Sequence, residues 1–304
     1  MLDMLDMRDS DWKRILDRID DGRCTPFLGA GACAGIFPVG SEIAQDWARE
    51  YSYPLALEDS YNLARVAQFV SVTEDDEMRP KEKIRKYFRD VPLPDFFAPD
   101  EPHGILAELP FPIYMTTNYD DCMTKALISR NKDPIQEVYR WNNHVRMKEE
   151  SIFEKEPGFQ PSPARPIVFH LHGYLKTVES LVLTEDDYLD ILVMMSREEK
   201  LLPTRIHEAM TGSSLLFLGY RIADWDFRVL FRSIVGSLQK SIARGHISVQ
   251  LVPGHNKFDK EQLEKVQQYL MKYFGQLRIR MYWGTCREFA TELRQRWTEY
   301  KHGN

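Results

Sequence analysis

Short apolar segments alternate with helical stretches along most of the chain, and this alternation limits the fold more than any other feature. Five of these segments have the length of buried strands: residues 112–116, 167–171, 215–218, 247–252 and 277–282. Most of them are separated by stretches with helical periodicity, and parallel strands require crossovers of this kind. The sequence therefore predicts an α/β fold with a doubly wound, mostly parallel sheet.

The first 50 residues predict a helix, a strand, a glycine turn and a second helix. Apolar residues recur at helical spacing over residues 10–19, and Ser10 is placed to cap that helix. Residues 25–28 predict a short buried strand, and Ser41 begins the second helical pattern. Between them lies the glycine turn, formed by Gly29, Ala30 and Gly31. This order opens many nucleotide-binding units, because glycines let a phosphate approach the backbone near a helix start; a plain tight turn is the alternative.

We expect a single domain over residues 1–304. Residues 58–90 have helical periodicity with a charged break at 74–77, and prolines after them indicate an irregular connection. The region 52–102 is therefore predicted to be a helical insertion within that domain. A charged, proline-rich stretch over residues 148–166 predicts a surface loop rather than a linker.

The composition argues against several classes of function. With 304 residues and 43% hydrophobic content, the chain can build a full core. A net charge of −6 and a pI near 5.8 argue against direct binding of nucleic acid. No segment approaches the run of about 20 apolar residues that a membrane span needs, and the N-terminus is acidic, unlike a signal peptide. We therefore expect a cytoplasmic protein without a membrane partner.

The four cysteines are scattered along the chain without a C-x-x-C pair: Cys24, Cys33, Cys122 and Cys286. This spacing suggests neither a disulfide framework nor a cysteine zinc site. We therefore expect reduced thiols and no metal. Cys33, close to the glycine turn, is interpreted as a small packing residue rather than a nucleophile.

Polar residues follow the segment at 112–116, directly before a predicted helix. They include Thr117, Asn118 and Asp120. Open α/β sheets bind ligands at the carboxyl ends of their strands, so these side chains are candidates for binding or catalysis. Threonine, asparagine and aspartate are also common helix caps, and from these residues alone capping is the more frequent role. Both interpretations stay open at this point.

Two further predicted strands end in residues that could take part in binding or catalysis. His170 and His172 end the next apolar segment, and strand alternation places them on the same side. A histidine there can act as a base near neutral pH, although a structural role is equally consistent. A later segment ends at Gly219, and Asp224 beyond it is interpreted as a helix cap.

The order of these features is more specific than any one of them. A glycine turn, T-x-N-x-D, H-G and a late strand with glycine follow one another, each at the end of a predicted strand. In this order the chain resembles the sirtuin family, over about residues 24–290. The resemblance implies a Rossmann-like domain that takes NAD as its substrate.

The resemblance also implies roles for individual residues. Asn118 would hold the nicotinamide ribose or the attacking water, Asp120 would receive the carboxamide, and His172 would act as the base. The other positions implied to bind NAD are Gly29, Ala30 and Gly31 at the phosphates, Thr117 beside Asn118, and Gly219, Tyr220, Gly284 and Thr285 under the adenosine half.

The chain departs from the sirtuin deacylases after His172. Those enzymes continue with a zinc module of paired C-x-x-C motifs and a segment that clamps an acyl-lysine peptide, and neither follows here. In this respect the chain resembles the sirtuin-like NADases of bacterial antiphage defence. The resemblance implies an enzyme that hydrolyses NAD to nicotinamide and ADP-ribose without a metal. A NAD-dependent protein deacylase and a non-catalytic sensor of NAD or ADP-ribose are the alternatives.

A NADase that is always active would deplete the NAD of its own cell. We therefore expect its activity to be controlled, either by formation of a homo-oligomer or by a separate sensor protein. Such control would fit an effector of abortive infection, as the resemblance implies.

Overall fold

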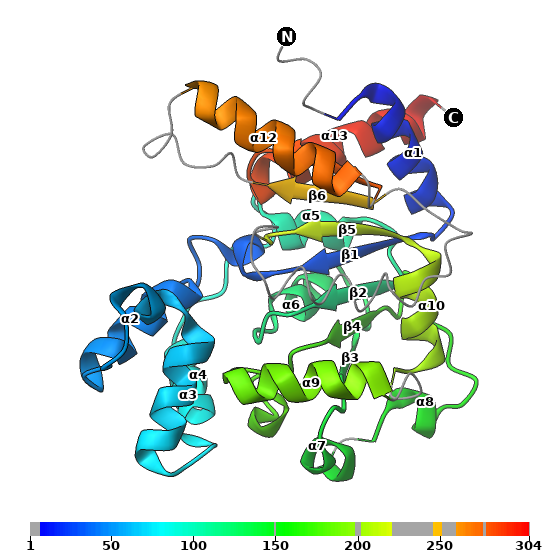
Figure 1. Ribbon diagram of the computed structural model, residues 1–304. Helices are drawn as coiled ribbons and strands as arrows, with labels where there is room; N and C mark the ends of the chain where they lie inside the picture. The colour runs from blue at the N-terminus through cyan, green and yellow to red at the C-terminus, as the bar shows by residue number, and fades with distance from the viewer. Residues whose placement is uncertain are drawn as a thin grey trace.

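The computed structural model describes residues 7–148, 150–197, 202–220, 246–250, 260–275 and 278–303. Within these residues, seven strands form one sheet in the order β3-β4-β2-β1-β5-β6-β7, and every neighbouring pair is parallel (Figure 1). The strands are β1 (Cys24–Leu28), β2 (Ile113–Thr116), β3 (Ile135–Val138), β4 (Ile167–His170), β5 (Ser214–Leu218), β6 (His246–Gln250) and β7 (Ile279–Trp283). The predicted doubly wound, mostly parallel α/β sheet is confirmed.

The strands form where apolar segments predicted them, with one exception. All residues of β1, β2, β4 and β5 are buried, which explains why these segments are mostly apolar. Strand β3 was not predicted, because it has only four residues and places Gln136 and Glu137 in its centre. The last two residues of the segment predicted at 247–252, and Leu277, lie outside the described residues.

Helices cover both faces of the sheet. One layer contains α1 (Asp9–Asp20), α5 (Pro102–Glu108), α6 (Cys122–Ser129) and α13 (Cys286–Gly303), and the other contains α9 (Glu185–Arg197), α10 (Thr204–Gly212) and α12 (Lys260–Gly275). Successive residues of a strand point to opposite layers, so that Phe27 and Leu28 of β1 belong to different cores. The sheet is therefore buried on both sides.

A third hydrophobic cluster lies mainly on helices that precede β2, and it also includes Val178, Leu181 and Leu183, which follow β4. It involves α2 (Gly40–Glu50), α3 (Leu63–Glu74) and α4 (Arg79–Arg89), with η3 (Leu57–Tyr61) between α2 and α3. Figure 1 shows these helices grouped beside the sheet rather than on either of its faces. The helical character predicted for residues 58–90 is confirmed. The definition of residues 52–102 as an insertion within one domain stays a proposal.

Two local predictions need correction. Helix α1 has Arg8 at its N-cap, because the Asp11 carboxylate accepts the Arg8 N–H, and Ser10 lies inside the first turn. The predicted loop at 148–166 contains a short helix, α8 (Ile152–Lys155), and it follows α7 (Asn143–Lys148). The predicted cap Asp224 lies outside the described residues.

The strand order reverses at β1, which has β2 on one side and β5 on the other. Ligands bind at such switch points, beyond the carboxyl ends of the strands. The polar groups that follow β1, β2, β4 and β5 all lie at this edge. Among the helices of the described part of the chain, none has the length and apolar character needed to cross a membrane.

Candidate functional site

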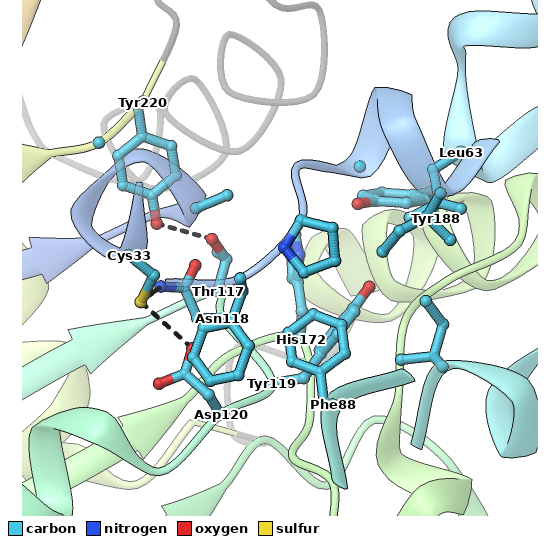
Figure 2. A pocket seen from close by; sticks show the side chains of 17 residues that line it. Cys33, Leu63, Phe88, Thr117, Asn118, Tyr119, Asp120, His172, Tyr188 and Tyr220 are labelled. Atoms are coloured by element: carbon cyan, nitrogen blue, oxygen red, sulfur yellow. Dashed lines mark hydrogen bonds between the residues drawn. The ribbon is translucent and has the colours of Figure 1, made fainter. Parts of the chain in front are cut away.

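A cavity of about 240 Å³ lies at this edge of the sheet, between the strand ends and helices α2–α4. The strand ends and the turns after them contribute Ala30, Cys33, Thr117, Asn118, Tyr119, Asp120, His172, Gly219 and Tyr220. The helical side contributes Phe37, Pro38, Gly40, Ile43, Leu63, Ile84 and Phe88, and α9 contributes Tyr188. Figure 2 shows Thr117, Asn118 and Asp120 on one side of the view, with Leu63 and Tyr188 on the other. The structure therefore brings the three predicted catalytic residues to one cavity.

Asn118 is held by the turns that end two neighbouring strands. Its backbone N–H donates to Thr116 Oγ1 at 2.9 Å, which folds the chain back directly after β2. Its side-chain Nδ2 donates to the carbonyl of Gly29 at 3.1 Å and to Cys33 Sγ at 3.4 Å. Because both N–H donors of the amide are engaged, Oδ1 is the group that remains for a ligand.

Asp120 lines the cavity but directs its oxygens toward the protein. Oδ1 accepts the backbone N–H of Cys122 at 2.9 Å at the start of α6, and Oδ2 lies 3.5 Å from Cys33 Sγ. The side chain is 9% exposed. The structure thus gives Asp120 a capping role, and its predicted contact with the carboxamide stays a prediction.

The two histidines of the H-x-H segment have different surroundings. His172 lines the cavity, and its ring meets Tyr188 edge-on at a centroid distance of 5.3 Å. Burial lowers the pKa of His172 to about 4, so its ring is neutral at pH 7. His170 instead donates from Nδ1 to the carbonyl of Asn118 at 3.2 Å and does not line the cavity, so it positions the turn that carries Asn118.

The glycine turn packs tightly against the end of β5. A Cβ atom on Gly31 would lie 2.8 Å from the Cα of Gly219, and Gly219 has a φ of +79°. The N–H groups of Gly29 and Gly31 donate to the carbonyls of Leu218 and Gly219. The glycines therefore allow two loops to approach each other. Of the turn, Ala30 is the residue that lines the cavity, and the predicted phosphate contacts of Gly29 and Gly31 stay predictions.

Thr117 and Tyr220 form a second link across the strand ends. The Tyr220 hydroxyl donates to the carbonyl of Leu28 at 2.8 Å, and it lies 2.8 Å from Thr117 Oγ1, which donates to it (Figure 2). Both residues line the cavity. Gly284 and Thr285, in contrast, follow the edge strand β7 and precede α13, where Thr285 Oγ1 accepts the Glu288 N–H. They are not among the described residues that line this cavity.

Sequence reasoning missed the apolar wall that α2, α3 and α4 provide. Leu63, Ile84 and Phe88 were recognised only as parts of helical patterns, yet they face the strand ends. The signal was weak, because a residue that lines a cavity and one that fills a core have the same helical spacing. This wall is joined to α9 by a buried ion pair, in which Lys81 Nζ lies 2.7 Å from Asp187 Oδ1.

The chemistry of the lining favours a neutral or cationic group over an anion. Asp120 is the one carboxylate among the residues described there, and none of them is lysine or arginine. Aromatic and aliphatic side chains can cover a flat ring, while Asn118 and His172 offer hydrogen-bond acceptors. This volume is below the roughly 300–1,000 Å³ typical of pockets for drug-sized ligands, so the cavity fits one part of a larger ligand.

Comparison with known proteins gives consistent matches. Residues 112–274 match a family model described as SIR2-like domain, and this covers more than half of the chain. A protein named NAD(+) hydrolase ThsA from Cytobacillus dafuensis is 24% identical over 223 residues, which cover 73% of this chain and 40% of that protein. A ThsA from Enterococcus faecium is 25% identical over 260 residues, covering 82% of this chain and 49% of that protein.

A third relative with the same name, from Acinetobacter baumannii (strain 532279), is 24% identical over 213 residues, which cover 69% of this chain and 39% of that protein. The chain thus spans two-fifths to one-half of the length of the curated relatives it matches. The family match includes the ends of β2, β4 and β5, but not the turn that follows β1.

Proposed function

The chain belongs to the family of SIR2-like domains, and from this premise we propose that it is a NAD glycohydrolase that cleaves the bond between nicotinamide and ribose. Three relatives carry the name NAD(+) hydrolase, which supports the substrate and the reaction. The observation that carries the proposal most directly is the presence of Asn118 and His172, which are far apart in sequence, in one cavity.

The reaction needs no proton donor for its leaving group. Nicotinamide leaves NAD as a neutral molecule from a cationic precursor, so the barrier lies in the ribose, which becomes an oxocarbenium-like cation. A cavity that orients the ribose and a water molecule therefore suffices. We propose that the nicotinamide riboside half occupies this cavity, because its lining is mostly uncharged and includes one carboxylate, Asp120.

Asn118 is proposed to orient the water or a ribose hydroxyl through Oδ1. Its Nδ2 donors are fixed by Gly29 and Cys33, so the amide cannot rotate without losing two hydrogen bonds. This pre-organisation means that the acceptor is in place before the substrate arrives, which reduces the entropic part of the barrier.

His172 is proposed to accept a proton from a ribose hydroxyl or from the water. Its ring is neutral at pH 7 because burial lowers its pKa to about 4, so a lone pair is available. Proton acceptance by a placed side chain contributes typically about 10²–10⁴-fold to a rate. We propose the same roles for Ala30, Thr117, Gly219 and Tyr220 as the resemblance implied, namely contacts to the rest of NAD.

The direct test is to incubate the purified chain with NAD and to quantify nicotinamide and ADP-ribose by chromatography. Equal amounts of both products, without any acyl-lysine peptide, would support the proposal. Release of nicotinamide only in the presence of an acyl-lysine peptide would instead indicate a deacylase. Binding of NAD without turnover, in the presence and absence of candidate partners, would indicate a sensor.

We also propose that the activity belongs to antiphage defence and is controlled by a partner or by oligomer formation. The family membership and the names of the relatives support this proposal. Measuring NAD turnover against protein concentration tests it, because an activity per molecule that is high and independent of concentration would contradict control by assembly.

A further inference from the structure

Three side chains that can bind metal, those of Cys33, Asp120 and Cys122, cluster at the edge of the cavity, and His103 lies against Cys33. Cys33 Sγ lies 3.6 Å from His103 Nε2 and 3.5 Å from Asp120 Oδ2. One ligand atom each of Cys33, Asp120 and Cys122 lies within 4.8 Å of the other two. Around a tetrahedral zinc ion with its usual bond lengths, neighbouring ligand atoms are separated by roughly 3.4–3.8 Å. The two distances from Cys33 Sγ therefore match those of a tetrahedral site.

The four residues come from three different parts of the fold. Cys33 ends the short helix η2 (Ala30–Cys33), His103 lies in the first turn of α5, and Asp120 and Cys122 are at the start of α6. All four are buried, from 0% exposed for Cys122 to 9% for Asp120. A metal here would be shielded from water and would connect the glycine turn to two helices.

The tautomer of His103 is set by a buried carboxylate. Glu101 Oε1 accepts the proton on His103 Nδ1 at 2.7 Å, and Oε2 accepts the Gly104 N–H at 2.6 Å. With the proton on Nδ1, the lone pair of Nε2 faces Cys33. Histidines that bind metal usually donate their other N–H to a carboxylate in this way.

We propose that Cys33, Cys122, Asp120 and His103 form a tetrahedral site for Zn²⁺ and that Glu101 orients His103 within it. The ligand set of two thiolates, one imidazole and one carboxylate suits this ion. On binding, each thiol loses its proton to solvent, and two thiolates, one carboxylate and Zn²⁺ leave a net charge of −1. The positive end of α6 and the Nδ2 donor of Asn118, which lies 3.4 Å from Cys33 Sγ, stabilise that charge.

Metal binding and loss of the thiol protons are coupled, because the thiolate is the form that binds a cation. The site is structural rather than catalytic, because the ion would have four protein ligands and no open position. Its effect on the reaction would be to fix the Cys33 sulfur that holds the Asn118 amide.

The experiment is a metal titration of the full chain after removal of bound metal with a chelator. Zn²⁺ alone is titrated against a chromophoric competitor, and Co²⁺ is used as a spectroscopic probe because thiolate-bound tetrahedral cobalt absorbs intensely. We expect one Zn²⁺ per chain and a cobalt spectrum with thiolate charge-transfer bands. Stoichiometry well below one, or cobalt spectra without these bands, would overturn the proposal, and neither result depends on NAD turnover.

Substitutions test which residues bind the metal. Cys33→Ser and Cys122→Ser are expected to abolish the cobalt charge-transfer bands that require both thiolates. Cys24→Ser and Cys286→Ser, which alter buried thiols outside the cluster, are expected to retain these bands. Glu101→Gln is expected to weaken Zn²⁺ binding by about 10–100-fold. Binding that survives in the Cys33→Ser, Cys122→Ser double variant would overturn the assignment. Thermal unfolding of each metal-free variant shows that it is folded before titration.

Discussion

The two sides of the cavity are held in place by different forces. On the sheet side, Asn118 and His172 follow strands whose register is fixed by backbone pairing, in which Thr116 pairs with both Leu28 and His170. On the helical side, Leu63 and Phe88 belong to helices that are fixed by side-chain packing. The comparison indicates that the sheet side sets the positions of reacting groups, whereas the helical side sets the shape that a ligand must have.

The largest effect is expected from Asn118→Ala, which removes the fixed amide from the sheet side. We expect the rate of nicotinamide release to fall by about 10²–10³-fold, the usual cost of losing one pre-organised polar group. Steady-state kinetics on NAD measures this, with thermal unfolding as a check of folding. Val72→Ala on α3 is the control, because Val72 is 70% exposed and does not line the cavity. Equal losses in both variants would contradict the distinction between the two sides.

The second effect concerns the contact between the glycine turn and the end of β5. Gly219→Ala would place a Cβ 2.2 Å from the Ala32 nitrogen, at a φ of +79°. We expect a loss of about 3 kcal/mol in the free energy of unfolding, from backbone strain and overpacking together. Gly35→Ala is the matched variant, since its φ is +82° but no atom lies within 4 Å of the added Cβ. Urea unfolding should therefore show a smaller loss for Gly35→Ala.

The third effect is a dependence of stability on pH. Burial lowers the pKa of His172 to about 4 in the folded protein, whereas in the unfolded chain it is about 6.5. The unfolded state therefore takes up the proton first, and the free energy of unfolding decreases as the pH falls from about 6.5 towards 4. For His172 alone we expect the free energy of unfolding to fall by about 2 kcal/mol between pH 7 and pH 5.

Urea unfolding at these two pH values, in wild type and in His172→Asn, measures that contribution. The variant should retain part of the dependence, because burial also lowers the pKa of His246 to about 4. His302→Asn, at an exposed position of α13, should retain all of it. An unchanged dependence in His172→Asn would show that the ring is not buried as the structure describes.

The smallest effect is expected on the helical side. Phe88→Ala removes a ring that stacks on Phe37 at a centroid distance of 4.8 Å and lines the cavity. We expect KM for NAD to rise by about tenfold with little change in kcat, because the ring contributes to binding equally before and during bond cleavage. A large fall in kcat at unchanged KM would show that this wall also positions the reacting groups.

Much of the fold and of the sheet side could be predicted from the sequence. Strands that are buried on both faces need mostly apolar residues, and β1, β2, β4 and β5 have them. The polar groups of Asn118 and His172 follow these strands directly, so a parallel sheet places them at one edge. Strand β3 escaped prediction because two of its four residues are Gln136 and Glu137, and a short edge strand needs no apolar run.

The helical wall and the cysteine cluster could not be predicted in the same way. Which face of α3 or α4 meets the cavity depends on how the helices are docked, and hydrophobic periodicity does not encode this. Cys33 and Cys122 are 89 positions apart, and only the turn after β1 and the start of α6 bring them together. Spacing along the chain therefore does not reveal that these two cysteines lie close together.

The Lys81–Asp187 ion pair has a consequence for the shape of the cavity. The pair joins the helical wall to α9 while both charges are buried, so α4 is held in place by a contact that lies outside the cavity. Removing one partner, as in Lys81→Met, would leave Asp187 buried without its cation, which costs about 3–5 kcal/mol. The shape of the cavity on its helical side therefore depends on two charges that a ligand in the cavity does not touch.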